Sequence, residues 1–89
     1  MAKAYVKLPV GMTTVGGEPQ IECEATTVAQ ALDLAIAAEP RLRPRVFRDD
    51  GRMWAGVFLN ARNINALGGL ETPLTDGDTL SVVPPISGG

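Results

Sequence analysis

The sequence contains no histidine and only one cysteine. Histidine is the commonest general base and the commonest metal ligand in proteins, so its absence removes Ser–His and Cys–His nucleophile pairs and most metal sites. A single cysteine also excludes an internal disulfide framework. These absences argue against the usual catalytic sites. They favour the interpretation that the protein is a substrate or partner of an enzyme, and not itself a catalyst.

An excess of basic residues and a long apolar run are also missing. The 89 residues carry a formal net charge of −2 and have a pI near 4.9, which argues against nucleic-acid binding because that function needs a basic surface. No stretch approaches the ~20 apolar residues of a membrane span. The first ten residues, MAKAYVKLPV, lack the apolar middle region of a signal peptide. We therefore expect one cytoplasmic domain whose partners include neither nucleic acid nor a membrane.

Alternating apolar and polar residues predict two strands near the N-terminus. Residues 3–9 and 20–25 place an apolar side chain at every second position, which is typical of strands that are buried on one face. Glycines in the intervening loop favour a hairpin with a turn longer than the tightest type. The side chains expected to point inward are those of Ala4, Val6, Leu8, Ile21, Cys23 and Ala25.

The clearest predicted element is a helix at about residues 28–39. Apolar residues recur there at the spacing of one helical face, and Thr27 with Gln30 fits a capping box at the start. Pro40 cannot continue the helix. The residues expected on the buried face are Val28, Ala31, Leu32, Ala35 and Ile36.

The second half of the chain predicts less regular structure around two further strands. Residues 41–52 carry five arginines and a turn signal at Asp50-Gly51, and are expected to be irregular. Residues 53–60 and 79–84 alternate as strands. Residues 61–74 are expected to be mostly loop, with a short strand near residues 63–65. One helix could then cover one face of a mixed sheet, which is an α+β arrangement.

Three features that could suggest chemistry are interpreted as structural. Cys23 is in phase with the inward residues of its strand, and no histidine or basic neighbour would activate it. The segments 49–51 (DDG) and 76–78 (DGD) lack the spacing of a calcium loop and favour turns. The arginines of residues 41–52 are interpreted as a solvated loop beyond a helix C-terminus, with an electrostatic contact to an acidic partner as the alternative.

Several segments together resemble the ubiquitin-like β-grasp fold and, more narrowly, the ThiS/MoaD family of sulfur carrier proteins. They are TPLTDGDTLSVVPPISGG (72–89), VFLNARNI (57–64) and the helix opening TVAQAL (27–32). The resemblance implies a mixed four- to five-stranded sheet packed on one main helix. It also implies a domain of residues 1–84 followed by a flexible tail, residues 85–89, that ends in Gly-Gly. The sequence looks most like cysteine-pathway carriers and long-form molybdopterin synthase small subunits.

The resemblance implies that the terminal carboxylate is the functional group. An E1-like adenylating and sulfurtransferase enzyme would use ATP to adenylate Gly89, and the product would be a thiocarboxylate that donates sulfur to an acceptor synthase. The sequence has no phosphate-binding loop of the GxxxxGK type, so the ATP would be bound by the partner, and we expect no bound cofactor or metal. The carrier itself would be a co-substrate, or the small subunit of a synthase.

The tail has the physical properties that such a reaction needs. Pro84 and Pro85 favour an extended backbone, and Gly88 and Gly89 lack the Cβ that would hinder passage through a narrow channel. Six residues span roughly 20 Å, enough to bring Gly89 into a partner's active site. The residues expected to form the tail and its docking surface are Pro84, Pro85, Ile86, Ser87, Val83 and Phe58.

Phe58 and Val83 are included because both point away from the helix-covered face. An apolar patch on an open sheet face often marks a partner site, and the family places its contacts there. The alternative is ordinary scattered apolar surface. Tyr5 and Trp54 are expected to border the patch, although Trp54 is equally compatible with packing under the loop of residues 41–52.

Other functions are compatible with the same sequence. Within the carrier hypothesis, cysteine or specialised-metabolite synthesis is favoured, molybdopterin synthesis comes next and thiamine thiazole synthesis last. A ubiquitin-like modifier would transfer the activated Gly89 to a lysine amine instead of receiving sulfur. A passive β-grasp interaction domain would not need the two final glycines at all.

Overall fold

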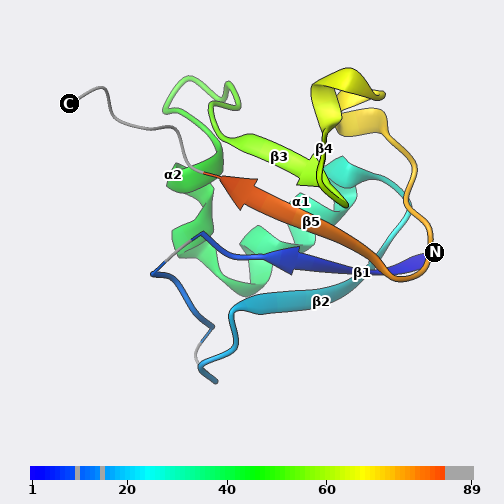
Figure 1. Cartoon of the computed structure of the whole chain (residues 1–89). Coiled ribbons are helices and arrows are strands. Elements are labelled where there is room, and N and C mark those ends of the chain that lie inside the picture. The colour runs from blue at the N-terminus through cyan, green and yellow to red at the C-terminus, as the bar shows by residue number, and fades with distance from the viewer. Residues whose placement is uncertain (10, 15, 84–89) are drawn as a thin grey trace.

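The computed structural model describes residues 1–9, 11–14 and 16–83, and a five-stranded sheet is its centre (Figure 1). The strands lie in the order β2-β1-β5-β3-β4. Only the central pair β1 and β5 is parallel, and the other three pairs are antiparallel. The strand bounds are β1 Ala2–Lys7, β2 Gln20–Ala25, β3 Gly56–Leu59, β4 Arg62–Asn63 and β5 Asp78–Val83.

One main helix, α1 (Val28–Ala38), covers one face of this sheet and lies behind it in Figure 1. Four of its residues at helical spacing are buried, and they pack on the inward residues of the strands, which include Val6, Val57 and Leu80. The predicted α+β class and mixed sheet are confirmed. Of the predicted inward residues, Ile21, Cys23 and Ile36 are only partly buried. The buried face of α1 consists of Val28, Ala31, Leu32 and Ala35.

Both ends of α1 follow from local chemistry. The Thr27 side chain accepts a hydrogen bond from the Gln30 N–H (3.3 Å), as the capping box predicts. The Gln30 side chain, however, accepts from the backbone N–H (2.7 Å) and hydroxyl (2.9 Å) of Thr26, one residue earlier than a capping box requires. The helix ends at Ala38, and Pro40 begins a separate 3-10 turn, Pro40–Leu42.

Replacing Leu32 by alanine is expected to lower the free energy of unfolding by about 2–4 kcal/mol. Leu32 is 1% exposed and belongs to the buried core that α1 shares with the sheet, so the truncation removes apolar contacts and leaves a cavity. Urea denaturation followed by circular dichroism measures the loss. A loss under about 1 kcal/mol would contradict this placement of the core.

The prediction that residues 41–52 are irregular is wrong at their start. Residues Pro40–Leu42 form the 3-10 turn, and Arg43–Val46 form a second short helix, α2. Leu42 and Val46 are fully buried. Their spacing of four places both on one face of the segment, where the surrounding arginines and Pro44 obscure the pattern in the sequence.

The predicted strand of residues 53–60 is shorter in the structure. Met53 pairs with Phe47 in an isolated bridge, and the backbone N–H of Trp54 donates to the Val46 carbonyl (2.9 Å). This part of the chain is therefore bonded to α2 and the residue that follows it, and not to a strand of the sheet. Regular pairing begins at Gly56. The predicted short strand near residues 63–65 is β4, at Arg62–Asn63, and the 3-10 turns Ile64–Ala66 and Gly69–Glu71 follow it.

Cys23 lies half-buried on β2 and is not in a disulfide. Burial, and to a lesser extent the neighbouring Glu22 carboxylate, raises the pKa of its thiol. Less thiolate therefore forms than on an ordinary cysteine, which agrees with the structural interpretation of Cys23. Within residues 1–9, 11–14 and 16–83, no three His, Cys, Asp or Glu side chains gather as a metal site. In the same part of the chain, no helix has the length and apolar character needed to span a membrane.

Candidate functional site

The sheet face opposite α1 carries a continuous row of side chains across all five strands. Lys7 of β1 lies between Gln20 of β2 and Ser81 of β5, and Ser81 in turn lies beside Phe58 of β3. Phe58 is paired with Asn63 of β4. Cross-strand partners project from the same face of a sheet. The open face therefore combines an apolar part on β3 and β5 with a polar part on β1 and β2.

Phe58 and Val83 meet over a glycine. Gly56 pairs with Val83, and a Cβ built on Gly56 would lie 3.3 Å from the Phe58 ring and 3.9 Å from the Val83 Cβ. The missing side chain therefore gives the ring its position beside the end of β5. Phe58 is half-buried and Val83 is 49% exposed. Both lie on the open face, and their role in docking stays a prediction.

A hydrogen-bonded clamp fixes the beginning of β5. The Asp78 carboxylate accepts from the Thr75 N–H (2.8 Å), the Thr75 hydroxyl (3.2 Å) and the Asn60 amide (2.8 Å). The Asn60 side-chain oxygen accepts from the Thr79 N–H (3.0 Å). These bonds tie the turn after β3 to β5. The predicted turn at residues 76–78 is confirmed, with Gly77 at a φ of 89°.

Asp78 makes the stability of this clamp depend on pH. Burial alone raises the pKa of Asp78, but the hydrogen bonds from Thr75 and Asn60 outweigh it and hold the pKa below its ordinary value of 3.8. A lowered carboxyl pKa in the folded state gives stability that is present above 3.8 and is lost as the pH falls through the folded value.

The variant Asp78→Asn is therefore expected to unfold about 1–2 kcal/mol more easily at neutral pH, because it loses the charge-assisted bonds. This deficit should shrink as the pH falls below 3.8, where the wild-type carboxylate itself becomes protonated. Urea unfolding of both proteins across that range measures it. A deficit that is equal at all pH values would show that the charge of Asp78 does not contribute.

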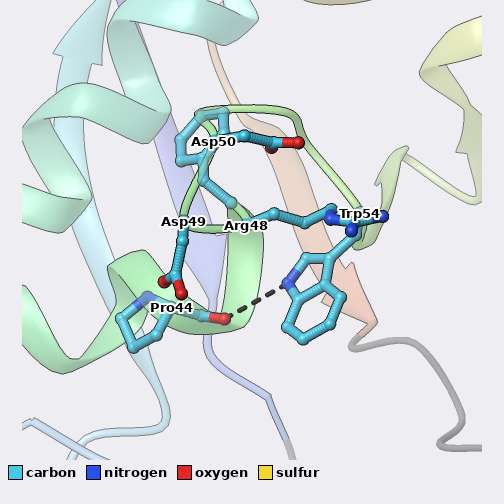
Figure 2. A pocket seen from close by; sticks show the side chains of 6 residues that line it. Pro44, Arg48, Asp49, Asp50 and Trp54 are labelled. Carbon is cyan, nitrogen blue, oxygen red and sulfur yellow. Dashed lines mark hydrogen bonds between the residues drawn. The ribbon is translucent and has the colours of Figure 1, made fainter.

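The opposite end of the sheet, where β5 ends, is bordered by α2 and the loop that follows it. The Trp54 indole N–H donates to the Pro44 carbonyl (3.2 Å), and the two side chains line a shallow depression (Figure 2). Trp54 is 49% exposed. Of the two positions predicted for Trp54, the structure places it against the segment of residues 41–52. The other residues that line the depression are Phe47, Arg48, Asp49 and Asp50.

Several arginines of this segment make contacts within the chain. The Arg41 Nε is 2.7 Å from the Glu39 carboxylate, and its Nη2 donates to the Thr13 carbonyl (2.7 Å). Hydrogen bonding from Arg41 lowers the pKa of Glu39, although burial opposes this shift. Arg43 lies 5.8 Å from the centre of the Phe47 ring. These contacts favour the structural interpretation of the arginines over a dedicated partner patch.

The tail residues Pro84, Pro85, Ile86, Ser87, Gly88 and Gly89 lie outside the described residues, as does the expected domain boundary at residue 84. What the structure fixes is the point from which they continue. Val83 ends β5, the middle strand of the sheet, and β1 and β3 lie on either side of that strand. The described chain thus ends in the middle of the sheet, on the strand that pairs with the strand of Phe58.

A sequence profile of the ThiS family matches residues 11–89, which include the last strand and the diglycine. The chain belongs to the ThiS family. Its residues are 31% identical over 86 positions to an Archaeoglobus fulgidus protein to which a sulfur-carrier role is assigned, and the match covers 94% of this chain and 96% of that protein.

Solved structures that are similar to this chain share its ubiquitin-like β-grasp fold. The small archaeal modifier protein 1 (SAMP1) of Methanosarcina acetivorans superimposes with a TM-score of 0.83 at 29% identity, covering 100% of this chain and 98% of that one. A chain of the BexX/CysO complex of Amycolatopsis orientalis superimposes with a TM-score of 0.77 at 28% identity, covering 97% and 99%. The family thus contains both sulfur carriers and ubiquitin-like modifiers.

Sequence reasoning missed the Asn60–Asp78 clamp. Both residues stand in segments that carry the resemblance, and the turn at 76–78 is predicted, but their partnership is not. A usable signal was the asparagine directly after a strand, because asparagine tolerates a positive φ. Asn60 has a φ of 50° and Ala61 a φ of 77°, which together form the tight turn between β3 and β4.

Proposed function

We propose that this protein is a cytoplasmic, non-catalytic sulfur carrier whose sulfur rides on Gly89. An E1-like enzyme adenylates the Gly89 carboxylate, and the thiocarboxylate formed from it donates sulfur in a biosynthetic reaction. One observation carries the proposal. The middle strand of a β-grasp sheet ends at Val83, and the six residues that follow it end in the diglycine covered by the ThiS family match.

The chemistry explains why an activating partner is needed. A carboxylate is a poor electrophile because its negative charge repels nucleophiles. Attack of the Gly89 carboxylate on the α-phosphate of ATP forms an acyl adenylate and releases pyrophosphate. Sulfide then attacks the acyl carbon, the bond to the AMP oxygen breaks, AMP leaves, and a C-terminal thiocarboxylate remains, with the sulfide proton passing to solvent. ATP is bound by the partner, since the sequence has no phosphate-binding loop.

The contribution of the carrier is to present its tail and be recognised. Phe58 and Val83 form an apolar patch beside the start of the tail, and the partner would bury this patch when Gly89 enters its active site. The polar row of Ser81 and Lys7 would lie at the rim of that contact. The same face can serve the activating enzyme and the sulfur-accepting synthase in turn, because both need the tail.

Cysteine or specialised-metabolite synthesis is the favoured use of the sulfur, and molybdopterin synthesis comes next. The likeness to a chain of the BexX/CysO complex supports a partnership with an enzyme of this kind. The carrier acts as a free co-substrate if its complex with the acceptor enzyme is short-lived, and as the small subunit of a synthase if that complex is long-lived. Gel filtration with the acceptor enzyme distinguishes the two.

The function is tested by incubating the full chain with an E1-like enzyme, ATP, Mg²⁺ and a sulfide source, followed by intact-mass measurement. We expect a mass gain equal to replacing one oxygen by sulfur, and we expect it to depend on ATP. The matched control is the chain that lacks Gly88 and Gly89. An unchanged mass with every enzyme that adenylates ThiS family proteins would refute the proposal.

The alternative function is a protein modifier that is conjugated to lysine through Gly89. The structural similarity to SAMP1 supports it, since that protein is called a modifier. Both functions begin with the same adenylation and differ in the nucleophile. In the experiment above, larger conjugates in place of the sulfur-bearing monomer would favour the modifier. An activity that survives loss of the diglycine would instead favour a passive interaction domain.

A further inference from the structure

β2 is a long edge strand, and its outer side pairs with no other strand among the residues that the structure describes. It forms one border of the sheet, beside β1 (Figure 1), whereas the strand at the other border, β4, has only two residues. The pairing of β2 with β1 runs without a bulge over six residues, and Gln20–Ala25 contains no proline. Natural edge strands are often shortened, bulged or interrupted by proline, because a regular unpaired edge can pair with another chain. β2 has none of these three features.

The register shows which backbone groups of β2 face outward. The Leu8 N–H donates to the Pro19 carbonyl (2.9 Å), so these two residues form a hydrogen-bonded pair just beyond the ends of both strands. Hydrogen-bonded and non-hydrogen-bonded pairs alternate along an antiparallel ladder. The N–H and C=O groups that point away from β1 are therefore those of Gln20, Glu22 and Glu24. Within residues 1–9, 11–14 and 16–83, no backbone hydrogen bond satisfies these groups.

An apolar groove runs along this edge on the side of α1. Ile21 and Cys23 pair with inward residues of β1, so they point toward α1, where they are only partly buried. Leu34 and Ala38, one turn apart on α1, are exposed and line the groove together with them. A strand added to β2 would place every second side chain over this β2 groove. Such alternate contacts give strand-addition complexes their side-chain specificity.

The open-face side of the same edge is acidic. Glu22 and Glu24 are exposed there and border the groove. The residue opposite Glu22 is Tyr5, which carries no positive charge. Lys3 lies opposite Glu24, but within the described part of the chain no ion pair of 4.0 Å or less joins the two. Because opposite charges on neighbouring strands are stabilising, an added strand is favoured by Lys or Arg at the positions opposite the two glutamates.

The same charges disfavour pairing of this edge with a second copy of the chain. Two β2 strands related by a two-fold axis perpendicular to the sheet run antiparallel, and their open-face residues lie opposite one another. The two registers with the longest overlap are centred on Glu22 and on Cys23. The first sets Glu22 opposite its own copy, and the second sets Glu22 opposite Glu24. Like charges directly opposite are destabilising, so the glutamates protect the edge from self-association and leave it open to a basic strand.

We propose that the β2 edge binds an extended basic segment of a partner protein, which adds a strand to the sheet. The segment carries Lys or Arg opposite Glu22 and Glu24, alternating with apolar residues that fill the β2 groove. Its backbone pairs with the outward N–H and C=O groups of β2. β1 separates this edge from β5 by about 10 Å. The carrier can therefore be held at β2 while another protein is seated on Phe58 and Val83.

The test is a titration of the ¹⁵N-labelled full chain with the peptide acetyl-KVRVKV-amide, followed by amide hydrogen exchange. We expect exchange at Gln20, Glu22 and Glu24 to slow at least about tenfold, because their amides gain hydrogen bonds. The amides of Ile21 and Cys23, which already face β1, should change little. The experiment needs no activating enzyme, so its failure is separate from a failure of the proposed function.

Two control peptides separate strand addition from general attraction of a cationic peptide to an acidic protein. The peptide acetyl-EVDVEV-amide reverses the charges. The basic peptide with N-methylated backbone amides keeps the side chains and loses its backbone donors. We expect neither to protect the three outward amides. Equal protection by either control, protection confined to other strands, or no protection by the basic peptide at millimolar concentration would overturn the proposal.

Matched variants test the part played by charge. The double variant Glu22→Gln and Glu24→Gln is expected to weaken binding of the basic peptide about tenfold, because it removes two favourable cross-strand charge pairs. Asp49→Asn with Glu71→Gln removes two exposed carboxylates outside β2 and should leave binding unchanged. Circular dichroism verifies that both proteins are folded. Equal losses in the two double variants, or a free chain that dimerises through β2, would contradict the proposed occupant.

Discussion

Removal of Gly88 and Gly89 is expected to abolish thiocarboxylate formation while leaving the free energy of unfolding within about 0.5 kcal/mol of the wild-type value. The shortened chain ends on Ser87, which has a Cβ. Its carboxylate is two residues short of the position at which the partner is proposed to adenylate Gly89. Within residues 1–9, 11–14 and 16–83, the buried apolar residues lie between Ala2 and Val82, and the truncation leaves all of these in place.

Two measurements on the same preparation separate these effects. Urea denaturation reports stability, and intact mass after incubation with the activating enzyme, ATP and sulfide reports sulfur loading. Ser87→Ala keeps the length of the tail and is the control, which should load normally. Sulfur loading of the shortened chain, or a loss of unfolding free energy above about 1 kcal/mol, would contradict the claim that the last two glycines are needed for sulfur loading and not for stability.

Phe58→Asp is expected to weaken binding to the activating enzyme at least about 30-fold, because it places a charge at the centre of the apolar patch. A loss of about 2 kcal/mol is typical of a central interface residue, and each 1.4 kcal/mol is a factor of ten in the dissociation constant. Val83→Asp, on the neighbouring strand, should behave similarly.

Leu34→Asp is the matched control for this patch. Leu34 is 41% exposed and belongs to α1, on the other side of the sheet. The substitution therefore introduces the same charge at an exposed apolar residue that the activating enzyme is not proposed to contact. Isothermal titration calorimetry with the activating enzyme measures all three variants. Equal effects of Leu34→Asp and Phe58→Asp would show that the open face has no special role.

The main elements of the fold could be predicted because each carries a strong local pattern. The helix of Val28–Ala38 has a complete apolar face and a cap at Thr27, and the strands at both ends of the chain alternate regularly. In these segments local preference and tertiary packing agree. The placement of Phe58 and Val83 on the open face followed from the same alternation.

Elements defined by long-range contacts could not be predicted in the same way. Trp54 continues the alternation of its predicted strand, but its backbone N–H is bonded to Val46 and its indole N–H to Pro44. Both partners belong to a segment that the sequence predicts to be irregular. The bond between Asn60 and Asp78 joins residues 18 positions apart. Neither contact has a periodic signature, since each depends on how separate segments meet in the folded chain.

The central claim is that sulfur is carried by the terminal carbonyl and by no other atom of the chain. Tandem mass spectrometry of the tryptic peptides, after incubation with the activating enzyme, ATP and sulfide, tests it most directly. We expect one oxygen to be replaced by sulfur at Gly89, in the peptide of residues 63–89, and no change in the peptide of residues 8–41. Sulfur bound to Cys23 in that second peptide, with Gly89 unmodified, would contradict the claim.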